Sequence, residues 1–162
     1  MDTAIELFEH ELRDIYDAEH KLVRALKTMA DKATNEELKK GFEEHLEVTA
    51  KQAGRLERVF ELIERKPRRE PCDGINGLIA EYSGFAKEEN PSPPVLDLFS
   101  TSAALKVEHY EICSYRSLIR LADVLGLSEA AGLFEQSLKE EQATAQELEQ
   151  LSEKLGHEVS PR

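Results

Sequence analysis

Four glutamate residues of this chain stand where a helical repeat otherwise places apolar side chains. The clearest is Glu19, which interrupts a stripe of apolar residues spaced three or four apart, the spacing of one buried helix face. A carboxylate on such a face is costly unless a proton, a partner or a cation neutralises it. Carboxylates gathered from several helices form an oxygen-rich site that suits iron or manganese, and magnesium or calcium less specifically. The four residues are Glu19, Glu108, Glu111 and Glu141.

Uncharged polar residues interrupt the same predicted helix faces, and each has two interpretations. His45 could supply a nitrogen ligand, or it could be a hydrogen-bonded histidine of the core. Gln52 could bind the ion through its amide oxygen, or it could join Thr49 and Thr144 in a polar network that satisfies the acids. Tyr115 lies one helical turn beyond Glu111 and could donate a hydrogen bond to a ligand carboxylate. The candidate metal ligands are Glu19, His45, Gln52, Glu108, Glu111 and Glu141.

The apolar periodicity predicts four long helices, one short helix and no strand. Thr34 and Glu37 match a capping box that opens the second long helix. Lys66 and Pro67 end that helix, and the proline-rich segment 90–94 separates the short helix from the third long one. The expected helices run from about residue 3 to 32, 34 to 66, 75 to 89, 95 to 125 and 128 to 155.

The two halves of the chain resemble each other. Residues 19–59 and 111–151 are identical at 12 of 41 positions without a gap, and Glu19 aligns with Glu111. Two related helical hairpins predict a bundle with approximate two-fold symmetry. This symmetry brings the polar interruptions of all four long helices into one layer of the bundle.

We therefore expect a single all-α domain over residues 1–162. The hairpins 3–65 and 95–155 form a four-helix bundle in this interpretation. The segment 66–94 is the long crossover that such a connectivity requires, and it carries the short extra helix.

The charge and the cysteines restrict the class of protein further. The net charge of −12 disfavours binding to nucleic acid or to an anionic membrane surface. No apolar run approaches the length of a membrane span, and the acidic N-terminal sequence does not resemble a signal peptide. Cys72 and Cys113 are far apart and predict free thiols of a cytoplasmic protein.

Three segments of the chain resemble one protein family, the YciE/YciF-type ferritin-like stress proteins of bacteria. They are ELRDIYDAE at 11–19, KVEHYEICSY at 106–115 and LKEEQAT at 138–144. The resemblance extends over essentially the whole chain. It implies a ferritin-like four-helix bundle, usually a homodimer, that takes part in stress responses and whose biochemical activity is not established.

The wider ferritin and rubrerythrin superfamily, in which each hairpin brings one Glu and a Glu-x-x-His pair, implies which ligands this chain has kept. The second hairpin resembles that pattern through Glu141, with Thr144 in place of the histidine. In the first hairpin Thr49 and Gln52 replace both residues of the pair. The half of the site that carries Glu19 is therefore poorer in ligands.

Two functions from different classes follow. The first is a stress-associated protein that binds one or two iron or manganese ions in its carboxylate layer. The second is a non-enzymatic structural protein that keeps the layer as a metal-free hydrogen-bond network. The missing histidines disfavour an enzyme, and any turnover would be rubrerythrin-like chemistry with peroxide or oxygen.

Overall fold

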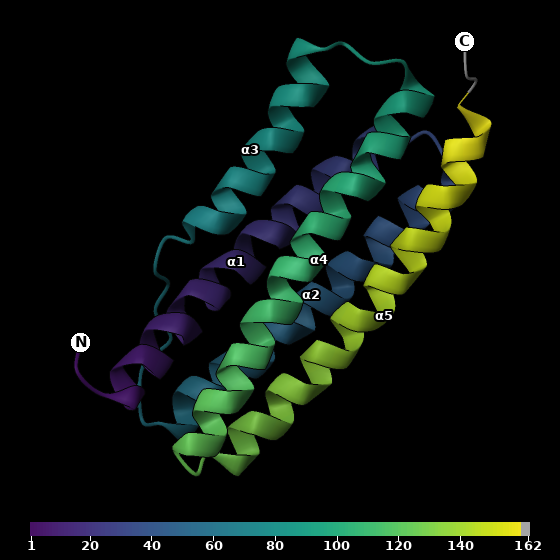
Figure 1. Ribbon diagram of the computed structural model, residues 1–162. Helices are drawn as coiled ribbons and strands as arrows, with labels where there is room; N and C mark the ends of the chain where they lie inside the picture. Colours follow the sequence, from purple (N-terminus) through teal and green to yellow (C-terminus); the bar gives the residue numbers. More distant parts are fainter. Residues whose placement is uncertain (160–162) are drawn as a thin grey trace.

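The structure, a computed structural model, describes residues 1–159. Over this range the chain is all-helical, without a strand. The four long helices run alongside one another, and the short α3 lies on the outside of the bundle (Figure 1). The predicted fold class, an all-α bundle with a helix in its crossover, is confirmed. The helices are α1 (Ala4–Lys32), α2 (Glu36–Leu62), α3 (Asp73–Glu88), α4 (Pro93–Val124) and α5 (Ser128–Glu158).

The packing follows the two hairpins that the sequence repeat predicts. α1 packs most extensively on α2, and α4 packs most extensively on α5. Contacts of α1 with α4 and of α2 with α5 close the bundle, and the seam between α2 and α5 is the smallest of the four. Every long helix therefore has two long neighbours, and its inward face meets the common interior.

The buried apolar side chains form two clusters rather than one continuous core. One contains Phe8, Leu56 and Phe134, and the other contains Phe42 and Leu148. The candidate ligands of α2, α4 and α5 lie between the segments that supply the two clusters, and in α1 Glu19 lies near their boundary. The apolar packing on both sides holds the polar layer at a fixed depth in the bundle.

The second helix begins differently from the sequence-based prediction. Its N-cap is Asn35, whose side chain accepts a hydrogen bond of 3.0 Å from the backbone N–H of Leu38. Thr34 instead donates from its hydroxyl to the buried Asp97 at 2.6 Å, and Asp97 also accepts from the backbone N–H groups of Thr34 and Asn35 at 3.0 and 2.8 Å. The predicted capping box of Thr34 with Glu37 was wrong, because a carboxylate from α4 binds this turn.

Three helix ends also differ from the expected positions. α2 ends at Leu62 rather than near residue 66, because the chain turns through Glu64 with a φ of 54°. α4 begins at Pro93, since proline is well tolerated in the first turn of a helix. α5 continues through Gly156 to Glu158, because a single glycine weakens a helix without necessarily ending it.

The crossover is attached to the face of α4 that carries apolar residues beyond the core stripe. Tyr110 donates a hydrogen bond of 2.9 Å to Asp14, and its hydroxyl lies 3.1 Å from the buried Cys72 Sγ. The ring of Tyr110 packs so closely on Gly74 that a Cβ there would lie 2.5 Å from it. The crossover therefore covers this part of α4.

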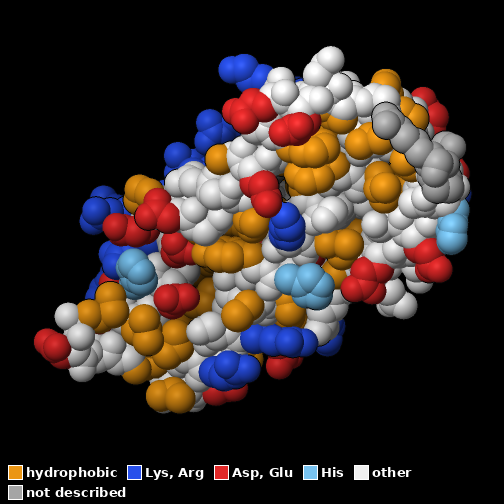
Figure 2. Space-filling model, turned by 45° about the horizontal axis from the view of Figure 1, so that its top comes forward, with side chains coloured by type: hydrophobic (Ala, Val, Ile, Leu, Met, Phe, Trp, Pro, Cys, Tyr) orange, Lys and Arg blue, Asp and Glu red, His pale blue; other side chains and the backbone are white. Residues whose placement is uncertain are grey.

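The surface is mixed in character. On the face shown in Figure 2, apolar, acidic and basic side chains are interspersed. None of the helices in the described range has the length and apolar character that crossing a membrane requires. Cys72 and Cys113 are both free thiols, the first buried and the second exposed.

Candidate metal centre

All six candidate ligands lie in the interior of the bundle. The most exposed of them, His45, retains only 7% of its accessible surface, and Glu19 and Glu111 retain none. Each long helix contributes to the layer, because each has one inward stripe at the helical spacing. Glu19 comes from α1, His45 and Gln52 from α2, Glu108 and Glu111 from α4, and Glu141 from α5.

Four of the six candidates converge on one point. His45, Glu108, Glu111 and Glu141 each offer a ligand atom, and these four atoms all lie within 4.8 Å of one another. Metal–ligand bonds of about 2.0–2.2 Å place opposite ligands of one ion about 4 Å apart. A small inward movement of the side chains is therefore enough to enclose one ion with one nitrogen and three carboxylates.

The carboxylates of the layer lack hydrogen-bond partners to an unusual degree. Neither oxygen of Glu111 has a partner within the described residues, and the same is true of one oxygen each of Glu19, Glu108 and Glu141. Buried polar atoms in folded proteins nearly always have a partner. A cation at the convergence point would meet the unpaired oxygens of the three glutamates there, so the residues present fit a metal ion.

Burial and mutual repulsion shift the acid–base behaviour of the layer. Burial raises the pKa of Glu108 to about 7. Burial, followed by repulsion from Glu141, raises the pKa of Glu19 and of Glu111 well above the usual value. Burial and the contact with Glu108 raise the pKa of Glu141 in the same way. In the absence of a cation these shifts favour the protonated carboxyls, and binding of a cation would release protons.

The orientation of His45 favours metal binding through Nε2. Thr144 donates its only hydroxyl proton to the backbone carbonyl of Glu140 at 3.1 Å. With the hydroxyl proton on that carbonyl, Thr144 can accept from His45 Nδ1 at their contact of 3.3 Å. This places a proton on Nδ1 and, in the neutral ring, leaves the Nε2 lone pair facing Glu108 at 3.2 Å and Glu141 at 3.8 Å.

Replacing Thr144 by valine should weaken metal binding about tenfold, as expected for loss of an outer hydrogen bond to a ligand. Valine keeps the shape of the side chain but cannot accept the proton of His45 Nδ1. Titration of the metal-free variant with Mn(II) measures the change. Thr144→Ser keeps the hydroxyl and serves as the control, and an unchanged affinity in Thr144→Val would show that Thr144 does not orient the ring.

The other two candidates are Glu19 and Gln52, and each forms a hydrogen bond with a neighbouring side chain of the layer. Tyr115 donates a hydrogen bond to Glu19, as the sequence suggested for a ligand carboxylate. Gln52 approaches Glu141 with its amide nitrogen, and that nitrogen also donates to Glu140 at 3.1 Å. The amide thus acts as a donor to the acids, so the structure favours the network interpretation of Gln52 over a ligand role.

Two residues that the sequence analysis did not single out extend this network. Arg55 binds Glu140 through two hydrogen bonds of 2.6 Å, and it reaches Ser137 Oγ at 3.2 Å. This ion pair lies beside Gln52 and is partly exposed. Arg55 follows Gln52 by three residues on the same helix face, which is a signal that could have found it.

Comparisons with known proteins agree on one family. A family model described as a domain of unknown function (DUF892) matches residues 3–159. Protein YciF of Escherichia coli K12 is 40% identical over 148 residues, which cover 89% of this chain and 87% of that protein.

Solved structures match over most of their length. The crystal structure of the E. coli stress protein YciF has a TM-score of 0.91 at 39% identity and covers 97% of this chain and 99% of that one. YcfI of Rhodopseudomonas palustris has a TM-score of 0.89 at 40% identity, covering 91% and 94% of the two chains. A protein of Xanthomonas campestris, 24% identical with a TM-score of 0.74 over 94% and 93% of the two chains, shares the fold.

Proposed function

The chain belongs to the family described as DUF892 and is a relative of the E. coli stress protein YciF. We propose that it is a ferritin-like, stress-associated protein that binds one divalent metal ion, iron or manganese. The observation that carries the proposal is Glu111, whose two buried oxygens lack partners while three further ligand atoms converge beside them. An oxygen-rich site with one imidazole suits these two metals.

The donors on the Glu19 side support one ion rather than two. A second ion needs its own carboxylates and open space, but there the hydroxyl of Tyr115 and the amide of Gln52 point at Glu19 and Glu141. A hydrogen-bond donor stabilises the charge of a carboxylate in part, as a cation would otherwise do. The ion therefore lies nearer Glu108, Glu111 and Glu141, and Glu19 contributes charge from a greater distance.

The carboxylates and the imidazole have different roles at this centre. Glu108, Glu111 and Glu141 neutralise the ion, and His45 supplies the nitrogen that disfavours purely oxygen-preferring cations. The apolar clusters on both sides of the layer lower the local dielectric constant and strengthen these interactions. We propose binding rather than turnover, because oxygen chemistry at paired irons requires the second set of ligands that the first hairpin lacks.

Metal analysis of the protein tests this function. Protein purified without chelator, stripped and reloaded anaerobically with Fe(II) or with Mn(II), is expected to hold one ion per chain. Loading to a hundred times the dissociation constant should stabilise the fold by about 2.7 kcal/mol. Sub-stoichiometric metal together with an unchanged melting temperature would contradict the proposal.

A metal-free polar layer is the second candidate function. The raised pKa values of Glu19, Glu111 and Glu141 favour it, because protonated carboxyls can donate hydrogen bonds within the layer. Under this alternative the protein acts through its surface, and the loaded and stripped forms melt alike. The homodimer and the cytoplasmic location inferred from the sequence stay predictions.

A further inference from the structure

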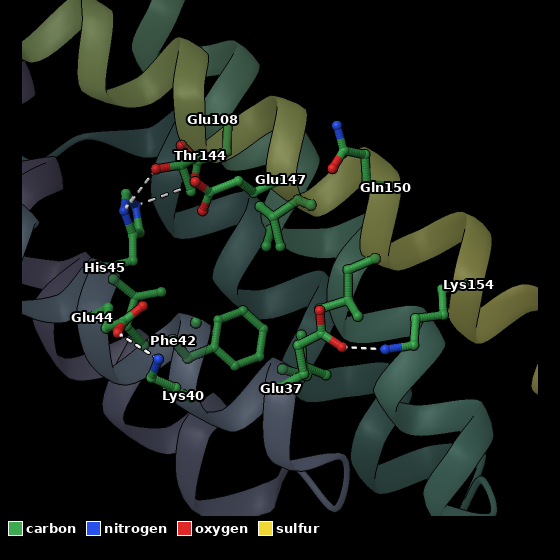
Figure 3. A pocket seen from close by; sticks show the side chains of 16 residues that line it. Glu37, Lys40, Phe42, Glu44, His45, Glu108, Thr144, Glu147, Gln150 and Lys154 are labelled. Carbon is green, nitrogen blue, oxygen red and sulfur yellow. Dashed lines mark hydrogen bonds and ion pairs between the residues drawn. The ribbon is translucent and has the colours of Figure 1, made fainter.

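A cavity of about 440 Å³ lies between α2 and α5, along the smallest seam of the bundle. Its volume falls in the range of pockets that bind small organic molecules. Residues of all four long helices contribute to its wall, and Figure 3 shows the side chains that line it. The apolar part of the wall consists of Leu26, Leu38, Phe42, Ala104, Leu148 and Leu151.

One end of the cavity meets the candidate metal centre. His45, Glu108 and Thr144 lie together at that end, and the ion pair of Glu37 with Lys154 lies at the other (Figure 3). Two metal-site residues are thus part of the cavity wall as well. A molecule bound along the apolar wall would have one end beside the metal centre.

The polar end of the cavity suits a ligand that can donate a hydrogen bond. Glu108 is 1% exposed, and its Oε2 has no partner within the described residues, so it is a buried acceptor that remains unsatisfied. An unpaired buried acceptor keeps the full cost of its desolvation, and a donor on a ligand would recover part of this cost. A hydroxyl group is the simplest end group that does so.

The charges on the cavity wall disfavour an anion. Both lysines that line it are already paired with glutamates, Lys154 with Glu37 and Lys40 with Glu44. The wall also contains Glu108 and Glu147, which leaves an excess of acid. A carboxylate end group would therefore enter against charge of its own sign.

We propose that this cavity is a binding site for a medium-chain, apolar molecule that ends in a hydroxyl group and has no negative charge. The alkyl chain lies along the apolar wall, where its burial removes apolar surface from water. The hydroxyl lies at Glu108. Its position next to a metal ion rests on the proposed function, whereas binding of the chain does not.

Binding to the metal-free protein tests the cavity and its preference. 1-Octanol is expected to bind at least tenfold more tightly than octanoate in NMR titrations. Ala104→Leu places a larger side chain in the cavity one turn from Glu108 and should weaken octanol binding at least tenfold. The matched control is Ala103→Leu, which faces a separate cavity of about 80 Å³ and should leave octanol binding unchanged. Equal binding of octanoate, or full binding by Ala104→Leu, would overturn the proposal.

A second variant covers the case in which Ala104→Leu does not fold. Leu151→Asn makes the half-buried part of the wall polar while keeping the branched shape of the side chain, and it should also weaken octanol binding. Unchanged binding in this variant would count against the cavity as well.

Mn(II)-loaded protein separates failure of the cavity from failure of the metal site. Paramagnetic relaxation by Mn(II) should broaden the protons next to the octanol hydroxyl more than those of its terminal methyl group, with Zn(II) as the diamagnetic control. Octanol binding without metal but with equal broadening of both ends would reject the placement of the hydroxyl. Octanol binding by a protein that takes up no metal would reject the proposed function and leave the cavity proposal supported.

Discussion

Replacing Glu111 by glutamine should stabilise the metal-free protein at pH 8 by on the order of 2 kcal/mol and weaken metal binding at least a hundredfold. Burial and repulsion from Glu141 raise the pKa of Glu111 well above its usual value, so folding at pH 8 must either protonate this group or bury its charge. Glutamine has the same shape without the charge, and its amide can donate to the neighbouring carboxylates. Urea unfolding in the presence of chelator and titration with Mn(II) measure the two effects.

The matched control is Glu149→Gln on the exposed side of α5, which should change neither quantity. Opposite effects on stability and affinity are the signature of a group kept for binding rather than for folding. A Glu111→Gln protein that binds Mn(II) like the wild type would remove Glu111 from the metal centre. A gain in stability without any metal binding in the wild type would favour the metal-free polar layer.

The metal-free protein should be more stable at pH 5.5 than at pH 8. The pKa of Glu108 is raised by burial from 4.5 to about 7 in the folded protein, so its contribution is fully present below pH 4.5 and is lost as the pH rises through 7. For Glu108 alone this amounts to about 2 kcal/mol between the two pH values. The pKa values of Glu19, Glu111 and Glu141 are raised too, so they act in the same direction. Thermal unfolding across this pH range, with chelator present, measures the change.

Bound metal should reverse this dependence, because the ion requires ionised carboxylates and its binding releases protons. In saturating Mn(II) the protein is expected to become more stable from pH 5.5 to pH 8. Glu108→Gln should flatten the dependence of the metal-free form. A metal-free protein whose stability rises over this interval would show that the layer is ionised and neutralised in another way.

The prediction of the polar layer from sequence succeeded because burial within one helix is a local property. The spacing of apolar residues around Glu19 places it on the inward face, and the structure shows it fully buried. The same reasoning placed Glu108, Glu111 and Glu141 in the interior. The repeat relation between the hairpins then set their common depth, since equivalent residues of two related hairpins occupy equivalent heights in a bundle.

Helical periodicity did not predict the contacts between residues of different helices. Asp97 binds the start of α2 from 62 positions away from Asn35, and the pair of Arg55 with Glu140 joins α2 to α5 across 85 positions. Helical periodicity contains no information on which residue of another helix lies opposite. The local capping pattern of Thr34 and Glu37 was therefore overridden by a stronger, charged acceptor brought in by the fold.

The sequence by itself determined that this protein is a helical bundle with an acidic interior layer, because the stripe of each helix depends only on residue spacing. Only the tertiary structure decided that His45 converges with Glu108, Glu111 and Glu141, that Tyr115 donates to Glu19, and that Gln52 turns its amide nitrogen toward Glu141. It also opened a cavity beside His45 and Glu108. The physical reason is that ligand geometry is set within a few tenths of an ångström by the rotation and rise of each helix against its neighbours, and these depend on the packing of the whole core.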